Sequence, residues 1–578
     1  MKIAIIGMGF RFPGACRPQE FWNILQEGRD LVGLPNEHRA ALFPKTHQPV
    51  PMEAGYLDQV DCFDAGFFNI NGLEARVLDP QQRLLLECAW ETLEEGGIQA
   101  SQLAGTRTGV FVGAHTHDYL ELCARAEIEV NAYWNAGMNA SVMANRISHF
   151  FDFTGPSVTL NTACSSGLEA VHQAAIALET GQCVMALAGG VNLILTPSVT
   201  LSASRAGMLS PESRCKTFDA AANGFVRGEG VGFLALKPLD QAQEDGDPIY
   251  GVIRGTASCH GGRANSLTAP NLTRQRDLLR NAYDRAGIDT SSISYLETHG
   301  TGTRLGDSIE VEALKEVFCQ NEAGPVLIGL GSVKTNIGHL ESAAGIAGMV
   351  KVCLAMKYRM LPATVHFNKA GSLIDLQDTG LYIVKDTQPW TVPEGPLRAG
   401  VSAFGFGGSY AHVILEEAPP SQAYLSNSQS SFLITLSALN PNRLAARAME
   451  LADWLSDRNP SLESLAYVLQ TGREPLSCRL AFIVEDKAQL RALLNQFHEK
   501  PGEGRDWYFA RLKGQRGCCP KPFSSDPSAH YPLKNKDIRT LARLWVDGVN
   551  VDFQDLYTER PPHLSLPTYP FAPKKHWI

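Results

Sequence analysis

The stretch VTLNTACSSGLEAVHQAAIAL, residues 158–178, decides the fold of the first half of the chain. Its first residues, Val158–Leu160, are β-branched or apolar and predict a short strand. After a polar turn, apolar residues recur at helical spacing, at Leu168, Val171, Ala175 and Leu178. Residues 327–333 and 342–356 repeat this order of strand, turn and helix. The repetition indicates a layered α/β architecture over residues 1–418.

The length of the chain requires more than one domain. It has 578 residues, whereas single hydrophobic cores stop growing at about 250–300 residues. The composition changes at Pro419-Pro420, because residues 421–431 are Ser-rich and poor in apolar residues. Residues 432–498 combine strand-like and amphipathic runs, which predicts a small α/β domain. Residues 499–537 have little periodicity and predict an irregular surface linker.

The C-terminal segment, residues 538–578, regains order. Leu541–Val546 has a helical pattern, and residues 564–578 place Tyr569, Phe571 and Trp577 among three prolines. Proline removes backbone donors and keeps the chain extended, so side chains must hold such a segment in place. We expect a helix followed by an extended segment that wraps back across the small domain onto the first one.

Composition excludes several classes of function. Hydrophobic residues make up 44% of the chain and the formal net charge is -9, without a basic run interleaved with aromatics. Nucleic acid is therefore not expected as a partner. No run approaches the ~18 apolar residues of a membrane span, and the apolar start at Ile3–Ile6 reads as a buried strand rather than a signal peptide. The 13 cysteines lack zinc-ligand spacing, so we expect reduced thiols in a cytoplasmic protein and no metal site.

Cys164 is the first candidate for chemistry, because it lies where the predicted strand turns into the predicted helix. Unpaired N–H groups at a helix N-terminus favour a thiolate and stabilise an oxyanion. A buried structural cysteine is the competing interpretation, and the placement alone leaves the two about equally supported.

Two histidines follow predicted strands in the second half. His299 lies in the stretch ETHGTGT (297–303), and His339 ends the stretch SVKTNIGH (332–339). Each alone is more often a hydrogen-bonded core residue than a catalyst. Together with Cys164 they form a nucleophile and acid/base set of the kind that gathers at strand ends in α/β folds. A glycine-rich loop around Phe406 is either a tight turn or an oxyanion loop with a mobile aromatic ring.

In this order, the motifs resemble those of the β-ketoacyl synthases of modular type I polyketide synthases. The matching stretches run from IIGMG (5–9) through DPQQR (79–83) to GFGG (405–408), and they cover essentially all of residues 1–418. The resemblance implies the thiolase fold, in which two similar α/β halves stack as five layers (αβαβα). It also implies a homodimer and a reaction that needs no bound metal or cofactor. The substrates of the reaction are carried on the phosphopantetheine of acyl carrier proteins.

The resemblance assigns a role to each site residue. Cys164 matches the acyl-carrying nucleophile, and His299 and His339 match the two histidines that support decarboxylation of malonyl-acyl carrier protein. The backbone N–H groups of Cys164 and Phe406 match the oxyanion hole. Supporting residues are a lysine and a glutamate that order the site and two hydroxyls that hold the phosphopantetheine arm, namely Lys334, Glu310, Thr301 and Thr303. The implied activity is polyketide chain elongation by decarboxylative Claisen condensation.

The sequence departs from the family pattern at four positions. Asn161 replaces the usual Asp, Gly167 replaces Ser or Ala, Ser308 replaces Pro and Tyr410 replaces Asn. None removes a catalytic group, so the departures bear on the acyl pocket and on substrate choice.

The C-terminal third resembles the flanking linker domain and wrapping peptide of ketosynthases whose assembly lines lack a built-in acyltransferase. The stretches that carry this resemblance are LQTGRE (469–474), RLAF (479–482) and LPTYPF (566–571). The acyltransferase motif G-H-S-x-G is missing, so the resemblance implies a separate, trans-acting acyltransferase, besides an upstream acyl carrier protein and a malonyl-loaded one.

The motifs allow three other interpretations. A dinucleotide site at Ile3–Gly9 lacks its third glycine, because Phe12 stands there. A carrier-protein site at Ser308 would need a small independent helical bundle. A non-elongating domain that only transfers acyl chains or docks partners is the remaining alternative, and the presence of both histidines favours activity.

Overall fold

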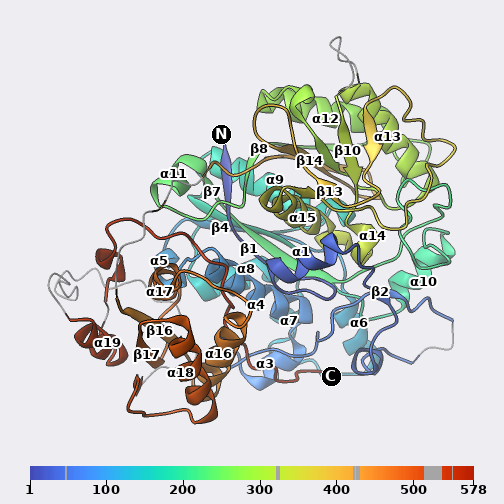
Figure 1. The fold of residues 1–578 in the computed structure, drawn as a ribbon. Coiled ribbons are helices and arrows are strands. Elements are labelled where there is room, and N and C mark those ends of the chain that lie inside the picture. The colour runs from blue at the N-terminus through green and yellow to red at the C-terminus, as the bar shows by residue number, and fades with distance from the viewer. Residues whose placement is uncertain (46–48, 320–325, 421–423, 425–429, 513–536, 550) are drawn as a thin grey trace.

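The computed structural model describes the chain except for residues 46–48, 320–325, 421–423, 425–429, 513–536 and 550. An eleven-stranded mixed sheet runs through the first domain (Figure 1). Its strands in spatial order are β12 (Leu381–Ile383), β10 (Ile328–Gly331), β9 (Tyr295–Glu297), β14 (Arg398–Phe404), β15 (Ser409–Glu416), β8 (Gly251–His260), β1 (Ile3–Arg11), β7 (Gly230–Pro238), β6 (Met185–Asn192), β4 (Thr108–Gly113) and β5 (Ser157–Leu160).

The sheet has two halves with the same plan. A short antiparallel pairing joins them, in which Ile3–Ile5 of β1 faces Gly251–Ile253 of β8. Away from this junction the strands run parallel, as β6, β4 and β5 in one half and as β14, β9, β10 and β12 in the other. Strands close to the junction pair antiparallel. Such a plan matches the repeated strand-and-helix order of the sequence.

Helices form three layers around the two half-sheets (Figure 1). The central layer holds α9 (Ser166–Glu179) and α15 (Ala344–Tyr358), and residues 344–356 of α15 are all buried because sheets and helices surround it. The outer layers are α4 (Pro80–Glu95) with α8 (Ser141–Phe151) on one side and α12 (Leu272–Ala286) with α13 (Arg304–Phe318) on the other. The predicted five-layered αβαβα fold is confirmed.

Shorter elements complete the first domain. They are the helices α1 (Pro18–Gln26), α2 (Glu37–Ala40), α3 (Gly72–Val77), α5 (Ala100–Leu103), α6 (Asp118–Arg125), α7 (Trp134–Met138), α10 (Ser198–Arg205), α11 (Leu239–Glu244) and α14 (Lys334–Ile337), and the strand pairs β2 (Val32–Gly33) with β3 (Ala54–Gly55) and β11 (Met360–Leu361) with β13 (Gln388–Pro389). Within the described part of the chain, no helix has the length and apolar character that crossing a membrane requires.

The linker domain is a three-stranded antiparallel sheet of β16 (Phe432–Ala438), β17 (Cys478–Val484) and β18 (Tyr508–Arg511). Side chains alternate between its faces: Ile434 and Phe482 pack with the helices next to the first domain, whereas Leu433 and Ala481 pack with the C-terminal helix. These helices are α16 (Pro441–Trp454), α17 (Leu462–Thr471) and α18 (Lys487–Glu499) on the first face and α19 (Ile538–Val546) on the second.

The prediction of an irregular linker over residues 499–537 is wrong in part. Tyr508–Arg511 form β18 and pair with Cys478–Ala481 of β17, so the linker domain extends beyond residue 498. The sequence signal was missed because the strand has only four residues and is half-buried. Residues 513–536 of the predicted linker lie outside the described part of the chain.

The contact between the linker domain and the first domain combines a shared apolar core with buried polar contacts. The Arg447 guanidinium of α16 donates to the Glu94 carboxylate of α4 at 3.0 Å, and each side chain is 3% exposed. A Cβ on Gly472 would lie 2.8 Å from the Cα of Gly97, so the backbones of the two domains touch there. A buried ion pair tolerates little displacement, because separating the charges leaves each one desolvated and unpaired. The two domains therefore form one packed unit.

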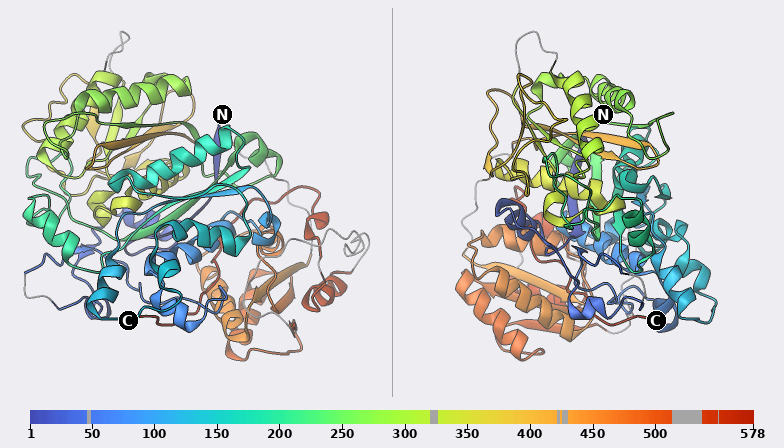
Figure 2. Two further views of the ribbon diagram at one scale, coloured as in Figure 1. Left: turned by 180° about the vertical axis from the view of Figure 1, so that it is seen from behind. Right: turned by 90° about the vertical axis from the view of Figure 1, so that its right-hand side faces the viewer.

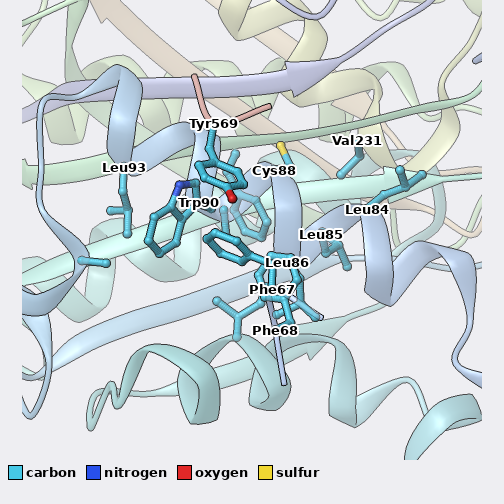
Figure 3. Close-up of a cluster of buried hydrophobic side chains, with 14 of the residues drawn as sticks. Phe67, Phe68, Leu84, Leu85, Leu86, Cys88, Trp90, Leu93, Val231 and Tyr569 are labelled. Atoms are coloured by element: carbon cyan, nitrogen blue, oxygen red, sulfur yellow. The ribbon is translucent and has the colours of Figure 1, made fainter. Parts of the chain in front are cut away.

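The C-terminal segment runs from the linker domain onto the first domain. In Figure 2 the C-terminus lies beside the blue segments of the first domain rather than with the orange linker domain. The Phe63 N–H donates to the Lys574 carbonyl at 2.9 Å, and the Arg83 guanidinium of the DPQQR motif donates to the His576 carbonyl. Tyr569 is 2% exposed and its ring centroid lies 4.6 Å from that of Phe67 (Figure 3). The predicted wrapping segment is confirmed.

Tyr569 ties three parts of the molecule together, because its hydroxyl also accepts the Leu439 N–H of the linker domain at 3.3 Å. We predict that Tyr569→Ala lowers the free energy of unfolding by about 3–5 kcal/mol, the range for deleting a buried aromatic side chain. Tyr569→Phe keeps the ring and is expected to cost only about 1 kcal/mol. Thermal and urea unfolding measure both. Equal melting of the alanine variant and the parent protein would rule out a clamping role.

Candidate active site

Cys164 lies on a tight turn between β5 and α9, in the 3-10 turn Ala163–Ser165. Ala163 has φ of 54°, a left-handed conformation that residues with a Cβ rarely adopt. Side chains hold the turn: the Ser166 hydroxyl donates to the Ala163 carbonyl at 2.6 Å, and the Ser165 hydroxyl lies 2.9 Å from the Ser409 carbonyl. Strained turns of this kind persist only where the surroundings hold them, and they are common at active sites.

The thiol of Cys164 is neutral in the resting protein. Burial raises its pKa to about 12, and the negative charge of Glu341 adds to that rise. The charge of Lys334 and the backbone N–H groups of Phe406 and of Cys164 itself oppose the rise without cancelling it. The expectation that the helix N-terminus favours a thiolate is therefore wrong for the resting site. Desolvation of a charged sulfur outweighs the helix dipole here.

The glycine-rich loop between β14 and β15 lies directly against the turn of Cys164. A Cβ on Gly405 would come within 2.3 Å of the Thr162 carbonyl oxygen, so only glycine permits this approach. The loop directs the Phe406 N–H toward the sulfur, while the Phe406 ring is 54% exposed. Two N–H groups thus point at the place where an oxyanion would form on an acyl group carried by Cys164.

His299 follows β9 on a loop that α13 holds in place. The N–H groups of His299 and Gly300 donate to the two carboxylate oxygens of Glu310 at 2.7 and 2.9 Å. The ring is half-buried, and its Nδ1 is shielded from solvent and has no hydrogen-bond partner among the described residues. Burial, the charge of Lys334 and the neighbouring His339 hold the pKa of His299 well below its usual value. The ring is therefore neutral at physiological pH.

His339 lies between α14 and the 3-10 turn Glu341–Ala343 that opens α15. Its Nδ1 accepts the Glu341 N–H at 3.1 Å, which leaves the ring proton on Nε2. Burial and the charge of Lys334 lower its pKa to about 3. The centroids of the His299 and His339 rings are 5.5 Å apart at an angle of 82°. Two neutral imidazoles thus share one buried site.

Lys334 supplies the positive charge of the site. It is 4% exposed, and its charge lowers the pKa of both histidines and of the Cys164 thiol. The resemblance paired it with Glu310, but Glu310 uses both oxygens on the backbone N–H groups of His299 and Gly300. Burial lowers the pKa of Lys334, and the charges of Glu297 and then Glu310 oppose this effect without cancelling it.

Asp307 is a buried acid that the sequence reasoning missed. It accepts the N–H groups of Phe218 at 2.8 Å and Gly302 at 3.2 Å, and burial raises its pKa to about 7. Glu310, one turn further along α13, has its pKa raised to about 7 by the same cause. An acid three residues before Glu310 in the sequence was the available signal, because that spacing places both side chains on one face of a helix.

Thr301 and Thr303 lie on the loop between His299 and α13, and their hydroxyl oxygens are 3.1 Å apart. Asp307 holds the loop through the Gly302 N–H, and the Gly302 carbonyl accepts the Gly224 N–H at 3.0 Å. Among the described residues, the hydroxyl hydrogen bonds of Thr301 and Thr303 join them to each other and not to Cys164, His299 or His339.

Two of the four departures have a structural reason. A Cβ on Gly167 would lie 2.7 Å from the Ser342 carbonyl oxygen, so the usual Ser or Ala does not fit without a shift of that backbone. The Tyr410 hydroxyl accepts the Asn271 N–H at 3.1 Å and thereby ties β15 to the start of α12. Asn161 accepts the Ala163 N–H at 3.2 Å, and Ser308 donates to the Leu305 carbonyl within α13.

Comparison with known proteins agrees with this geometry. The family model described as Beta-ketoacyl synthase, N-terminal domain matches residues 1–242, and the corresponding C-terminal domain matches residues 250–368. The chain belongs to the β-ketoacyl synthase family. Its linker domain is similar to the RhiE-like, KS-MAT linker domain, which matches residues 435–501. The molecule is thus a ketosynthase with a flanking linker domain.

Solved ketosynthase structures match this ketosynthase over its whole length. The ketosynthase from module 6 of the bacillaene synthase from Bacillus subtilis 168 is 36% identical, with a TM-score of 0.87 and full coverage of both chains. The oxazolomycin ketosynthase domain OzmH KS7 from Streptomyces albus JA3453 is 34% identical, with a TM-score of 0.89, and is covered over 98% of its length.

Much longer proteins contain similar sequences. Polyketide synthase PksN from Bacillus subtilis (strain 168) is 41% identical over 606 residues, which span all of this chain but 11% of PksN. Erythronolide synthase EryA2 from Saccharopolyspora erythraea is 40% identical over 508 residues, which span 86% of this chain and 14% of EryA2. The chain therefore spans about a tenth to a seventh of the length of these relatives.

We predict that Cys164→Ala abolishes the mass increase that follows exposure to an acyl thioester, because the Phe406 N–H faces the Cys164 thiol. Cys16→Ala is the matched control, since Cys16 is exposed and distant in sequence from the site. Intact-protein mass spectrometry measures both variants. A stable acyl adduct on the Cys164→Ala protein would refute the assignment of the nucleophile.

The raised pKa of the Cys164 thiol predicts a pH dependence. The thiolate is the reactive form, so its fraction and the rate of alkylation should rise about tenfold per pH unit between about pH 7 and pH 9. Iodoacetamide labelling of the peptide that contains Cys164 measures this rate. A plateau beginning near neutral pH would mean that the thiol is already ionised and that burial does not control it.

Proposed function

We propose that this ketosynthase elongates an acyl chain by decarboxylative Claisen condensation. The observation that carries the proposal is the pair of neutral histidines beside the turn of Cys164, with the proton of His339 on Nε2. A neutral imidazole with a free N–H can donate to a thioester oxygen and stabilise the enolate that forms there. Membership in the β-ketoacyl synthase family supports the same chemistry.

In the first step Cys164 accepts the acyl chain. The sulfur attacks the thioester carbonyl of an acyl group on an acyl carrier protein, and the tetrahedral oxyanion accepts the N–H groups of Cys164 and Phe406. The phosphopantetheine sulfur then leaves and takes up the proton that Cys164 gives up. Because the pKa of the Cys164 thiol is about 12, the thiol loses its proton only in this step, when the sulfur binds the acyl carbon.

In the second step malonyl-acyl carrier protein replaces the first carrier protein. Loss of CO₂ leaves an electron pair on the α-carbon, and His299 and His339 donate to the thioester oxygen that shares this charge. The α-carbon attacks the acyl carbonyl, the carbon–sulfur bond to Cys164 breaks, and the thiol regains a proton. Because decarboxylation generates the carbanion, the step draws on no metal or redox cofactor.

The supporting residues act through charge and position. Lys334 keeps both histidines neutral, and Glu310 holds the backbone of His299 through two hydrogen bonds. Thr301 and Thr303 lie beside His299 and offer hydroxyls to the amides of the phosphopantetheine arm. Asp307 holds that loop by accepting the Gly302 N–H.

The partners follow from the same chemistry. Acyl carrier proteins, one with the growing chain and one with malonate, bring both substrates. A separate acyltransferase would load the malonate, because a built-in one would lie between the two pieces of the linker, where only residues 499–537 stand. We place the protein in the cytoplasm, as a homodimer. Strand β5 supports the dimer: it is the outermost strand of the sheet, and Val158 on it is 39% exposed, as suits pairing with a second copy.

The alternative is a ketosynthase-like domain that only transfers acyl chains or docks partners. It would keep the reaction of Cys164 and lack the condensation step. The buried, neutral state of both histidines favours elongation, because a transfer-only domain has no use for two donors directed at a malonyl thioester.

We predict that His299→Ala and His339→Ala retain most of the acylation of Cys164 and lose condensation by about 10²–10⁴-fold, the contribution usual for positioned acid/base groups. Acyl loading is followed by protein mass, and condensation by the β-ketoacyl product on the carrier protein. Undiminished condensation in either variant would remove that histidine from the mechanism. A parent protein that loads acyl groups but never condenses them would support the transfer-only alternative.

A further inference from the structure

The turns that open the two central helices have the same construction. In the first half, the left-handed residue Ala163 precedes Cys164, and its N–H donates to the Asn161 side chain at 3.2 Å. In the second half, Glu341 has φ of 48°, and its N–H donates to His339 Nδ1 at 3.1 Å. In both turns a side chain two residues earlier accepts the N–H of the left-handed residue. One copy presents the nucleophile, and the other sets the tautomer of a histidine.

Glu341 occupies a backbone conformation that is strained for any residue except glycine. Its side chain supplies what holds it there. The Arg227 guanidinium donates to the two carboxylate oxygens at 2.5 and 3.1 Å, and His115 Nε2 lies 3.0 Å from the second oxygen. Arg227 is 2% and Glu341 5% exposed, so water screens these contacts little. The carboxylate stays ionised, because the charge and hydrogen bonds of Arg227 and His115 lower its pKa.

The segment around Arg227 also holds the backbone of His339. The His339 N–H donates to the Val226 carbonyl at 2.7 Å, and the Gly228 N–H donates to the His339 carbonyl at 2.8 Å. His339 is therefore fixed at its backbone by residues 226–228 and at its ring by the N–H of Glu341. The Arg227–Glu341 ion pair links these two supports, because it joins the same two segments through their side chains.

We propose that Glu341 is a positioning residue for His339: its carboxylate, held by Arg227 and His115, fixes the left-handed turn whose N–H keeps the ring proton of His339 on Nε2. The inference rests on the proposed condensation, in which that proton faces the malonyl thioester. Glu341 does not serve acylation, because the oxyanion formed there accepts the N–H groups of Cys164 and Phe406. Its negative charge in fact opposes ionisation of the Cys164 thiol.

The test separates decarboxylation from acylation in Glu341→Gln. Malonyl decarboxylation is measured as conversion of malonyl-acyl carrier protein to acetyl-acyl carrier protein, with Cys164 blocked by iodoacetamide. Acylation is measured as the mass increase of unblocked protein with an acyl thioester. We expect decarboxylation to fall on the order of 10- to 100-fold, as for a displaced reacting group, and acylation to stay at or above the parent rate.

Glu94→Gln is the matched control, because Glu94 is equally buried and also pairs with an arginine, Arg447, but lies at the linker interface. It should destabilise the protein similarly and leave the ratio of decarboxylation to acylation unchanged. His115→Gln keeps the Arg227–Glu341 pair and serves if Glu341→Gln does not fold. We expect it to lower decarboxylation in the same direction by a smaller factor.

The outcomes are distinct. If decarboxylation and acylation fall together in the Glu341 variant, as in the Glu94 control, the residue has only a structural role and the proposal is overturned. Full decarboxylation in both Glu341→Gln and His115→Gln would overturn it as well. A parent protein without any decarboxylation would instead remove the condensation chemistry itself, so this failure is separable from the failure of the positioning role.

Discussion

A close backbone approach between the start of α9 and the turn before α15 governs the rest of the structure. A Cβ on Gly167 would lie 2.7 Å from the Ser342 carbonyl oxygen, and a Cβ on Gly190 would lie 2.6 Å from the same atom. Gly167 lies in the first turn of α9 and Gly190 on β6, so glycine at these positions lets the turn before α15 lie against both elements. Because Cys164 stands just before α9 and His339 just before α15, this backbone contact brings the two residues into one site.

Burial controls the protonation states of the groups in that site. It raises the pKa of the Cys164 thiol and of Asp307 and Glu310, and it lowers the pKa of both histidines. Each shift favours the neutral form, since desolvation penalises charge of either sign. The charge of Lys334 lowers the pKa of both histidines, in the same direction as burial. Neutral histidines are what the proposed donation of hydrogen bonds to an enolate requires.

The linker domain and the C-terminal segment pack against the first half-sheet, and their described residues add no group to the site. The Arg447–Glu94 pair, the contact of Gly472 with Gly97 and the packing of Tyr569 on Phe67 all lie on the outer face of the first half-sheet. They hold α4, which covers the sheet that carries β5 and the turn of Cys164. A small number of buried contacts thus connects the end of the chain to the scaffold of the nucleophile.

The sequence by itself determined the fold class, the linker domain and the residue types of the site. The order of strand, turn and helix repeats around Cys164 and His339, and the spacing of apolar residues predicts each of these elements from the local sequence. The order of the motifs indicated the family resemblance. Even Tyr569, Phe571 and Trp577 indicated a bound tail, because proline and aromatic residues leave few other ways to hold such a segment.

Tertiary structure alone decided the protonation states and the partners of the site. The sequence favoured a thiolate at Cys164, but the pKa depends on how much protein surrounds the sulfur and on Glu341, 177 positions away in the chain. The pairing of Arg227 with Glu341 and the use of Glu310 on backbone N–H groups cannot be seen in the local sequence either. Strand β18 was missed for the same reason, since four half-buried residues become a strand only when β17 offers its edge. Charge interaction and desolvation depend on distance in space, which residue order does not encode.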